Sequence, residues 1–177
     1  YIKTSIIHMD IIKYMEGVEY MNFELETIKK VVDYIEENLN DELNLDKIAE
    51  KAGYSKFHLH RIFSKIVGET IHKYIQKRRL TEAARKLVYT DESIIDIALI
   101  SGYESQQAFT LAFKKMYKSS PQMYRIKKNF EPKQLSIDIE EVFNYYENQY
   151  KSHENLYDNK IIRKNGPYKS DSLKMAA

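Results

Sequence analysis

The chain has 177 residues, with 28 Lys and Arg against 26 Asp and Glu, and a formal net charge of +2. This length allows one hydrophobic core or two small ones and is short for a multidomain enzyme. The absence of cysteine excludes disulfides, Cys-ligated metals and thiol catalysis, and it fits a cytoplasmic protein. With five Gly, three Pro and 43% hydrophobic residues, the composition predicts a compact helical protein.

The charge is unevenly distributed along the chain. Residues 45–128 contain seventeen basic and eight acidic residues, a charge of +9, whereas residues 23–44 carry −5 and the two ends −1 each. A basic segment between acidic flanks is typical of a protein that binds a polyanion, although charged runs are also normal solvated surface. The total near zero therefore does not exclude a nucleic-acid partner. No run of 18 apolar residues occurs, so we expect no membrane partner.

The first predicted elements are helices. Residues 1–22 form an N-terminal extension whose apolar positions are compatible with a helix. From Glu24 to Leu39, apolar residues at spacings of three and four predict an amphipathic helix with an acidic opposite face.

The next segment predicts a helix-turn-helix over residues 45–67. Asn44 and Ser55 are suitable N-caps for two short helices, and Gly53 lies in the turn between them, where a left-handed residue is needed. Two short helices joined in this way are the pattern of that motif. A longer linker helix is expected over residues 70–89, and at about 1.5 Å per residue it spans about 30 Å.

A second helix-turn-helix is expected over residues 94–117, and it repeats the first. Ser93, Gly102 and Ser105 supply the same caps and turn, at an offset of 49 residues before the turn and 50 after it. Two such motifs about 30 Å apart match the spacing of about 34–36 Å between successive major grooves on one face of DNA. The predicted fold is therefore all-α, with two homeodomain-like three-helix units joined by the linker helix.

The second helix of each motif offers candidate DNA-binding side chains opposite its apolar stripe. Arg can form two hydrogen bonds with guanine, a Gln amide both donates to and accepts from adenine, and an apolar group can pack on a thymine methyl. The candidates of the first motif are Lys56, Phe57, His60, Arg61 and Ser64, and those of the second are Ser105, Gln106, Gln107, Thr110, Leu111 and Lys114.

The run from Gly53 to Phe63, together with the run from Gly102 to Thr110, resembles the AraC/XylS family of bacterial transcription regulators. Within that family it is similar to the subgroup of the multiple-antibiotic-resistance, superoxide-response and Rob activators. The resemblance implies an AraC-type DNA-binding domain over residues 23–128 that binds an asymmetric promoter site as a monomer and recruits RNA polymerase. It also implies base-reading roles for six of the candidates, namely Phe57, His60, Arg61, Gln106, Gln107 and Thr110.

Two positions depart from the subgroup's pattern. His60 stands where Gln is usual, and Leu111 stands where a basic residue is usual. We therefore expect a different DNA sequence to be read, especially by the second motif.

Other functional classes stay open on the sequence. A non-specific architectural nucleic-acid-binding protein would share the basic segment, whereas a protein-interaction module would not require it. We expect no enzyme and no cofactor, because no phosphate-binding loop, dinucleotide fingerprint or nucleophile elbow occurs. His58 and His60 are two residues apart, so on a helix they diverge and cannot share a metal.

Residues 129–177 are interpreted as a C-terminal appendage or the beginning of a truncated effector domain. A helix is expected from Ile139 to Tyr150. A small-molecule effector, if the regulator has one, would bind through a part outside this sequence.

Overall fold

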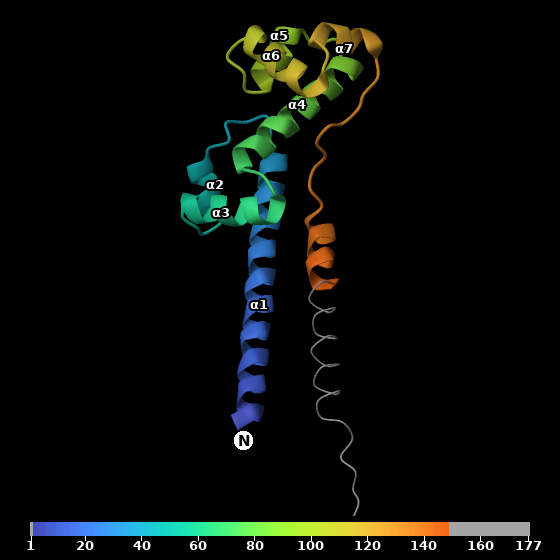
Figure 1. Ribbon diagram of the computed structural model, residues 1–177. Helices are drawn as coiled ribbons and strands as arrows, with labels where there is room; N and C mark the ends of the chain where they lie inside the picture. The colour runs from blue at the N-terminus through green and yellow to red at the C-terminus, as the bar shows by residue number, and fades with distance from the viewer. Residues whose placement is uncertain (1, 149–177) are drawn as a thin grey trace, which may run out of the picture. The chain divides into compact units, whose positions relative to one another are not determined.

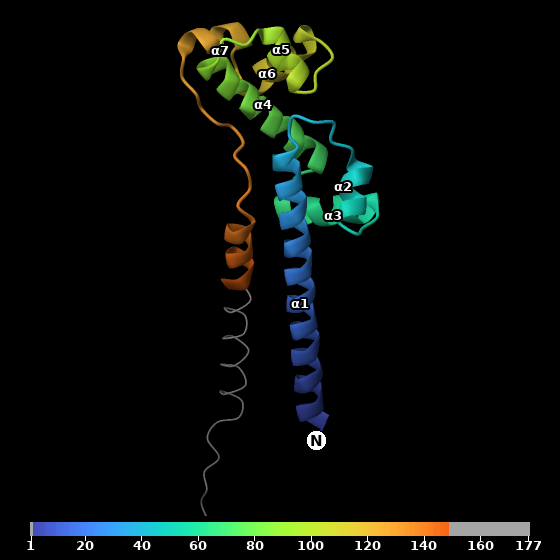
Figure 2. The ribbon, with the colours of Figure 1, turned by 180° about the vertical axis from the view of Figure 1, so that it is seen from behind.

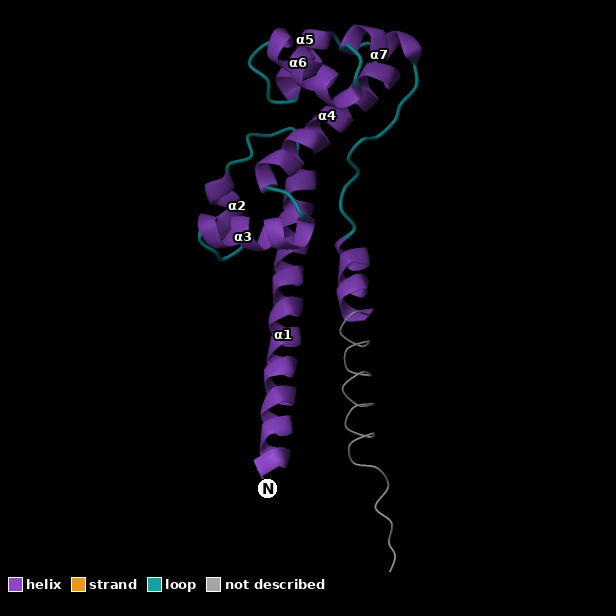
Figure 3. Cartoon of the chain, viewed as in Figure 1, coloured by secondary structure: helices purple, strands orange, loops and turns teal. Residues whose placement is uncertain are grey.

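The computed structural model describes the backbone of residues 2–148 and the side chains of residues 20–148. All regular elements in this part of the chain are helices, as Figure 3 shows. Residues 19–139 form one compact unit, and this unit carries both predicted motifs.

The first helix is longer than expected. α1 (Ile2–Glu37) runs without interruption through residue 22, because residues 18–37 contain no Gly or Pro and no cap. It ends two residues before the predicted Leu39, where the Asn38 side chain donates a 2.7 Å hydrogen bond to the Tyr34 carbonyl. Within the compact unit, its apolar stripe is buried and includes Leu25, Ile28, Val31, Val32 and Ile35.

Residues 139–148, the described part of the helix expected from Ile139 to Tyr150, are helical, and six further helices lie between them and α1. Their serine and asparagine N-caps are confirmed: each cap oxygen accepts a hydrogen bond from a backbone N–H two or three residues further on. The helices are α2 (Leu45–Lys51), α3 (Lys56–Val67), α4 (Ile71–Tyr89), α5 (Ile94–Ile100), α6 (Gln106–Tyr117) and α7 (Pro121–Lys127).

α4 is shared between two hydrophobic cores. It runs from the α2–α3 pair to the group formed by α5, α6 and α7 (Figure 1). In its first half the ring of Tyr74 packs against Phe63 of α3, with ring centroids 5.8 Å apart. In its second half Leu80, Ala84 and Leu87 belong to the other core. We call the parts built on these halves the first and second subdomains.

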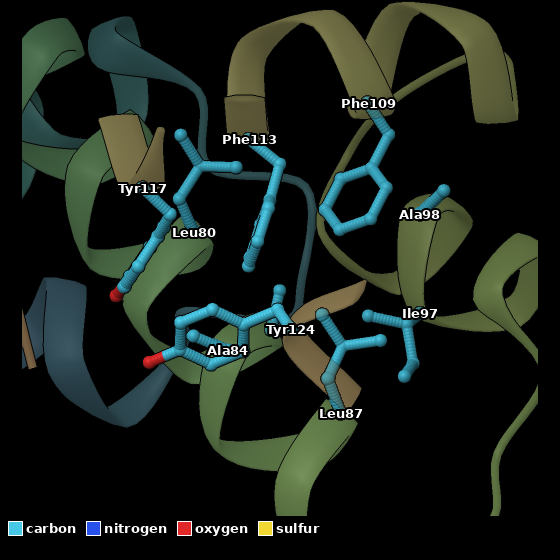
Figure 4. Packing of buried hydrophobic residues seen from close by; sticks show 10 residues of the cluster. Leu80, Ala84, Leu87, Ile97, Ala98, Phe109, Phe113, Tyr117 and Tyr124 are labelled. Atoms are coloured by element: carbon cyan, nitrogen blue, oxygen red, sulfur yellow. The ribbon is translucent and has the colours of Figure 1, made fainter. Parts of the chain in front are cut away.

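The core of the second subdomain is rich in aromatic rings (Figure 4). Phe113 stacks on Tyr117 with centroids 4.6 Å apart and meets Phe109 and Tyr124 at 5.5 and 5.3 Å. Tilted and edge-to-face contacts of this kind add to the stabilisation that apolar burial gives. These rings fix α6 and α7 on α4.

Two arginines of α4, Arg78 and Arg79, form hydrogen bonds with other parts of the compact unit. Arg78 is buried and forms a two-pronged ion pair with Glu36 of α1, at 2.9 and 2.7 Å. Arg79 donates to the carbonyls of Leu39 and Asp41 at 2.8 and 2.6 Å. Both arginines therefore bind α4 to the end of α1 and the turn that follows it. These contacts could not be predicted from the sequence pattern, because the partners lie about 40 residues away.

Glu36 also contacts Tyr74 of α4, whose pKa is raised. The hydroxyl of Tyr74 donates to a Glu36 carboxylate oxygen at 2.8 Å. Burial, assisted by this carboxylate, raises the pKa of Tyr74 to about 12. The tyrosine is thus neutral at physiological pH and acts as a hydrogen-bond donor between α4 and α1.

Candidate nucleic-acid interface

The first candidate surface lies on α3, whose apolar side is fully committed to the core. Leu59, Ile62 and Phe63 are at most 1% exposed, so the opposite side of the helix must face outward. Phe57 is 80% exposed there. Of the remaining candidates, Lys56 and Arg61 are exposed and His60 is half-buried.

Neighbouring side chains position two of these cations. Lys56 forms a 2.6 Å ion pair with Asp46 of α2, although both groups are largely exposed. Arg61 lies with its Nη2 3.3 Å from Nδ1 of His58, and the His58 ring stacks on Tyr54 in the turn at 4.7 Å. Sequence reasoning missed this supporting role of His58, for which the signal was an aromatic residue four positions earlier.

Ser64 does not join the outward face of α3. Its hydroxyl oxygen is buried, whereas the sequence placed it among the candidates that face solvent. The chain turns at Gly68 from α3 into α4, and the last turn of α3 is therefore more covered than its first turn.

The second candidate surface lies on α6. Gln106, Gln107 and Lys114 are exposed and Thr110 is half-buried. Leu111 is 74% exposed and lies on the same outward side. These side chains occupy one face because Phe109 and Phe113 are fully buried on the other.

Ser105 has a structural task at the start of α6. Its hydroxyl oxygen accepts a 3.2 Å hydrogen bond from the backbone N–H of Ala108, which caps the helix. The two adjacent glutamines therefore project from the first turn of a fixed helix end.

Both turns use a left-handed glycine, but their surroundings differ. Gly53 has φ of +73° and Gly102 has φ of +81°, values that side-chain-bearing residues rarely adopt. A Cβ at Gly53 would meet nothing within 4 Å, whereas one at Gly102 would lie 2.4 Å from Nη1 of Arg79. The second turn thus packs directly on the arginine that joins α4 to α1.

Part of the positive charge of residues 45–128 is neutralised inside the molecule. Lys65 of α3 pairs at 2.7 Å with the buried Glu24 of α1, and Lys77 pairs at 2.6 Å with Glu69. Arg125 of α7 donates to backbone carbonyls. Two acidic residues of α1, Glu24 and Glu36, thus pair with Lys65 of α3 and Arg78 of α4 instead of lying on the expected solvent face.

Within the described part of the chain, no helix combines the length and the apolar character that a membrane span requires. Nor does this part contain three or more His, Asp or Glu side chains grouped closely enough to hold a metal ion.

The chain is similar in sequence to known transcription regulators. Residues 48–127 match the family described as "Helix-turn-helix domain". The chain is 44% identical over 100 residues to the multiple antibiotic resistance protein MarA of Salmonella typhimurium, which covers 56% of this chain and 79% of MarA. It is 48% identical over 98 residues to the uncharacterized HTH-type transcriptional regulator YbfP of Bacillus subtilis. That match covers 55% of this chain and spans only 33% of YbfP.

A solved structure has the same arrangement of helices. The DNA-binding domain of AdpA, a global transcriptional factor crystallised with a target DNA, superposes with a TM-score of 0.53. The two chains are 26% identical, and the match covers 56% of this chain and 89% of that one.

Proposed function

The chain belongs to the AraC-type helix-turn-helix family of transcription regulators, and on that premise we propose that it binds promoter DNA in a sequence-specific manner. Residues 23–128 would form the DNA-binding domain, with α3 and α6 inserted into successive major grooves. The observation that carries the proposal is the repeat itself: two capped helices in one compact unit, each with a core-bound apolar side and an outward polar side.

The outward side chains suggest how each helix would read bases. Arg61 can form two hydrogen bonds with guanine, and Phe57 can pack on a thymine methyl. Gln106 and Gln107 can each hydrogen-bond adenine, while Leu111 can only make an apolar contact. His60 and Thr110, which are half-buried, would contact bases from the margins of these faces.

Cationic side chains would fix the position on the phosphates. Lys114 is exposed near the end of α6, and Lys56 would exchange its exposed partner Asp46 for a phosphate. Ser105 can donate its hydroxyl hydrogen to a phosphate because only its oxygen lone pair is used in capping.

The regulatory consequences follow from the family. We propose that the protein acts in the cytoplasm as an activator that recruits RNA polymerase. Since one compact unit holds both helices, a monomer suffices for an asymmetric site. Any small-molecule effector would bind through another part of the protein.

Selection of bound sites from random duplex DNA tests this proposal directly. We expect one asymmetric consensus with two half-sites about one helical turn apart, about 10 base pairs centre to centre. Affinity for the selected site should fall steeply with salt and still exceed that for random DNA at every salt concentration.

The main alternative makes a different prediction for the same experiment. A non-specific architectural protein would show the salt dependence but enrich no sequence. Failure to bind any duplex at low salt would instead favour a protein-interaction module. The exposed Gln106, Gln107 and Arg61 favour the sequence-specific interpretation, because phosphate binding alone does not need them.

A further inference from the structure

The segment that follows α7 is not part of either helix-turn-helix motif. Residues 129–139, which we call the C-terminal strap, leave α7 and run back along α4, as both ribbon views show (Figures 1 and 2). The strap begins on the second subdomain. Phe130 packs against its core and meets Tyr89 edge-to-face at 6.0 Å, and the N–H of Glu131 donates to the Tyr124 hydroxyl at 2.9 Å.

The middle of the strap is hydrogen-bonded to the centre of α4. The N–H of Gln134 donates to the hydroxyl oxygen of Thr81 at 3.2 Å, and its carbonyl accepts from Nη1 of Arg78 at 2.9 Å. Thr81 is buried and also accepts from the hydroxyl of Tyr117 in α6 at 3.4 Å. Arg78 is the residue that holds Glu36 of α1. The strap therefore contacts Arg78, which binds α4 to α1, and Thr81, which binds α4 to α6.

The end of the strap reaches the first subdomain. The N–H of Ile137 donates to the hydroxyl of Tyr74 at 3.4 Å, and Tyr74 packs on Phe63 of α3. The side chain of Ile139 is 5% exposed. The strap thus packs through Phe130 at one end, has a buried side chain, Ile139, at the other, and forms backbone hydrogen bonds with α4 between them.

We propose that the C-terminal strap fixes the orientation of α3 relative to α6 and thereby sets the half-site spacing that the protein accepts. A single shared helix keeps the two subdomains at a fixed distance. Their rotation about the helix axis is limited only by the contacts that each subdomain makes with α4. A second connection that runs parallel to α4 removes that freedom before binding. Preorganisation of this kind raises affinity for the matching site and penalises sites with another spacing. The DNA part of this inference rests on the proposed function.

The orientation can be measured without DNA. Because the chain has no native cysteine, Glu50→Cys in α2 and Lys115→Cys in α6 create two unique exposed positions for spin labels. We expect a narrow distance distribution in the full chain. Phe130→Ala combined with Ile139→Ala removes the apolar side chain at each end of the strap and should broaden the distribution by about twofold or more. The matched control is Leu135→Ala, which alters a strap residue that is 66% exposed and should leave the width unchanged.

The second measurement uses the selected DNA site and versions with two base pairs added or removed between the half-sites. We expect the parent chain to lose about tenfold or more in affinity on either altered site. The double variant should bind the selected site several-fold more weakly and show a clearly smaller spacing penalty.

Each result decides the matter. An unchanged distance distribution in the double variant would overturn the proposal whatever the DNA results. A broadened distribution with the parental spacing penalty would overturn the strap's role in site selection. A parent chain without sequence preference would refute the proposed function, while the distance measurement still decides the structural role. If the double variant loses helical content, Thr81→Val takes its place with the same expected direction. It removes the contacts of both Gln134 and Tyr117 with Thr81, so Tyr117→Phe, which removes only the second contact, is its control.

Discussion

α3 and α6 occupy corresponding places in the two helix-turn-helix motifs, but the side chains on their outward faces differ. Positions that correspond in the two helices differ by 50 in number, so Arg61 of α3 corresponds to Leu111 of α6, and Phe57 corresponds to Gln107. Caps, turn glycines and core phenylalanines are retained in both copies, while the exposed residues have diverged. The comparison teaches that the repeat preserves a frame that presents a helix, whereas each copy carries its own set of contacts.

The cores behind these helices differ as well. Among the residues whose side chains are described, Phe63 of the first subdomain has one close ring partner, Tyr74, whereas its equivalent Phe113 contacts three aromatic rings. Both phenylalanines are fully buried. The second core therefore depends more heavily on a single ring.

The largest expected effect comes from truncating that ring. Phe113→Ala should lower the free energy of unfolding by about 3–5 kcal/mol, and Phe63→Ala should fall near the lower end of that range. Urea unfolding followed by circular dichroism measures both. Because α4 belongs to both cores, we expect one transition in each variant. Two separate transitions, or a loss below about 1 kcal/mol for Phe113→Ala, would contradict this description of the cores.

The next effect separates the outward faces. Arg61→Ala should weaken binding to the selected site by about 1–3 kcal/mol and relax the preference at one base pair. Its structural counterpart, Leu111→Ala, should cost less than about 1 kcal/mol because only an apolar contact is lost. Fluorescence anisotropy on the selected site and on random duplex gives both numbers. Equal weakening on the two DNAs would argue against base reading by Arg61.

A smaller effect distinguishes the two turns. Gly53→Ala should destabilise the protein by about 1 kcal/mol, since only the left-handed backbone is strained. Gly102→Ala should cost about 2 kcal/mol, because the new Cβ also displaces Arg79 from its carbonyl partners. Thermal and urea unfolding report the difference. In an Arg79→Ala background the two glycine substitutions should become similar, and a persistent gap would assign the extra cost to another cause.

The smallest effect concerns the ends of α3 and α6. α3 ends at Gly68 with φ of +80°, whereas α6 ends at Lys118 with φ of +57°. Lys118→Gly should therefore raise the free energy of unfolding by about 0.5–1 kcal/mol, and Gly68→Ala should lower it by about 1 kcal/mol. Both changes are measurable by urea unfolding. A destabilised Lys118→Gly variant would mean that the lysine side chain contributes more than its backbone costs.

Local signals made most of the fold predictable. Ser55, Ser93 and Ser105 act within three residues of themselves, so their capping roles are legible in the sequence. The apolar spacing between Glu24 and Leu39 identified a buried stripe for the same reason. The continuation of α1 through residue 22 was missed because a helix boundary was sought where the sequence has no stop signal.

Features that depend on distant partners could not be read in this way. The pairing of Arg78 with Glu36 joins residues 42 positions apart, and both side chains look like ordinary surface charges in sequence. The C-terminal strap has no periodicity and binds mainly through its backbone, which leaves no trace in side-chain patterns. In the candidate site, Arg61 and Gln106 are exposed on the outward faces, as predicted. The prediction that Ser64 faces solvent was wrong, because burial of its hydroxyl oxygen depends on how the chain passes from α3 into α4.

The shared helix also has a consequence for synthesis of the chain. The first core can form only after Tyr74 and its neighbours on α4 have left the ribosome. The second half of α4 then presents Leu80 and Leu87 to solvent until Phe113 and Tyr124 arrive about 40 residues later. At translation rates of about 5–20 residues per second, this leaves an apolar stripe uncovered for about 2–8 s. We therefore expect this stripe of α4 to be a surface that chaperones can bind while the chain is being synthesised.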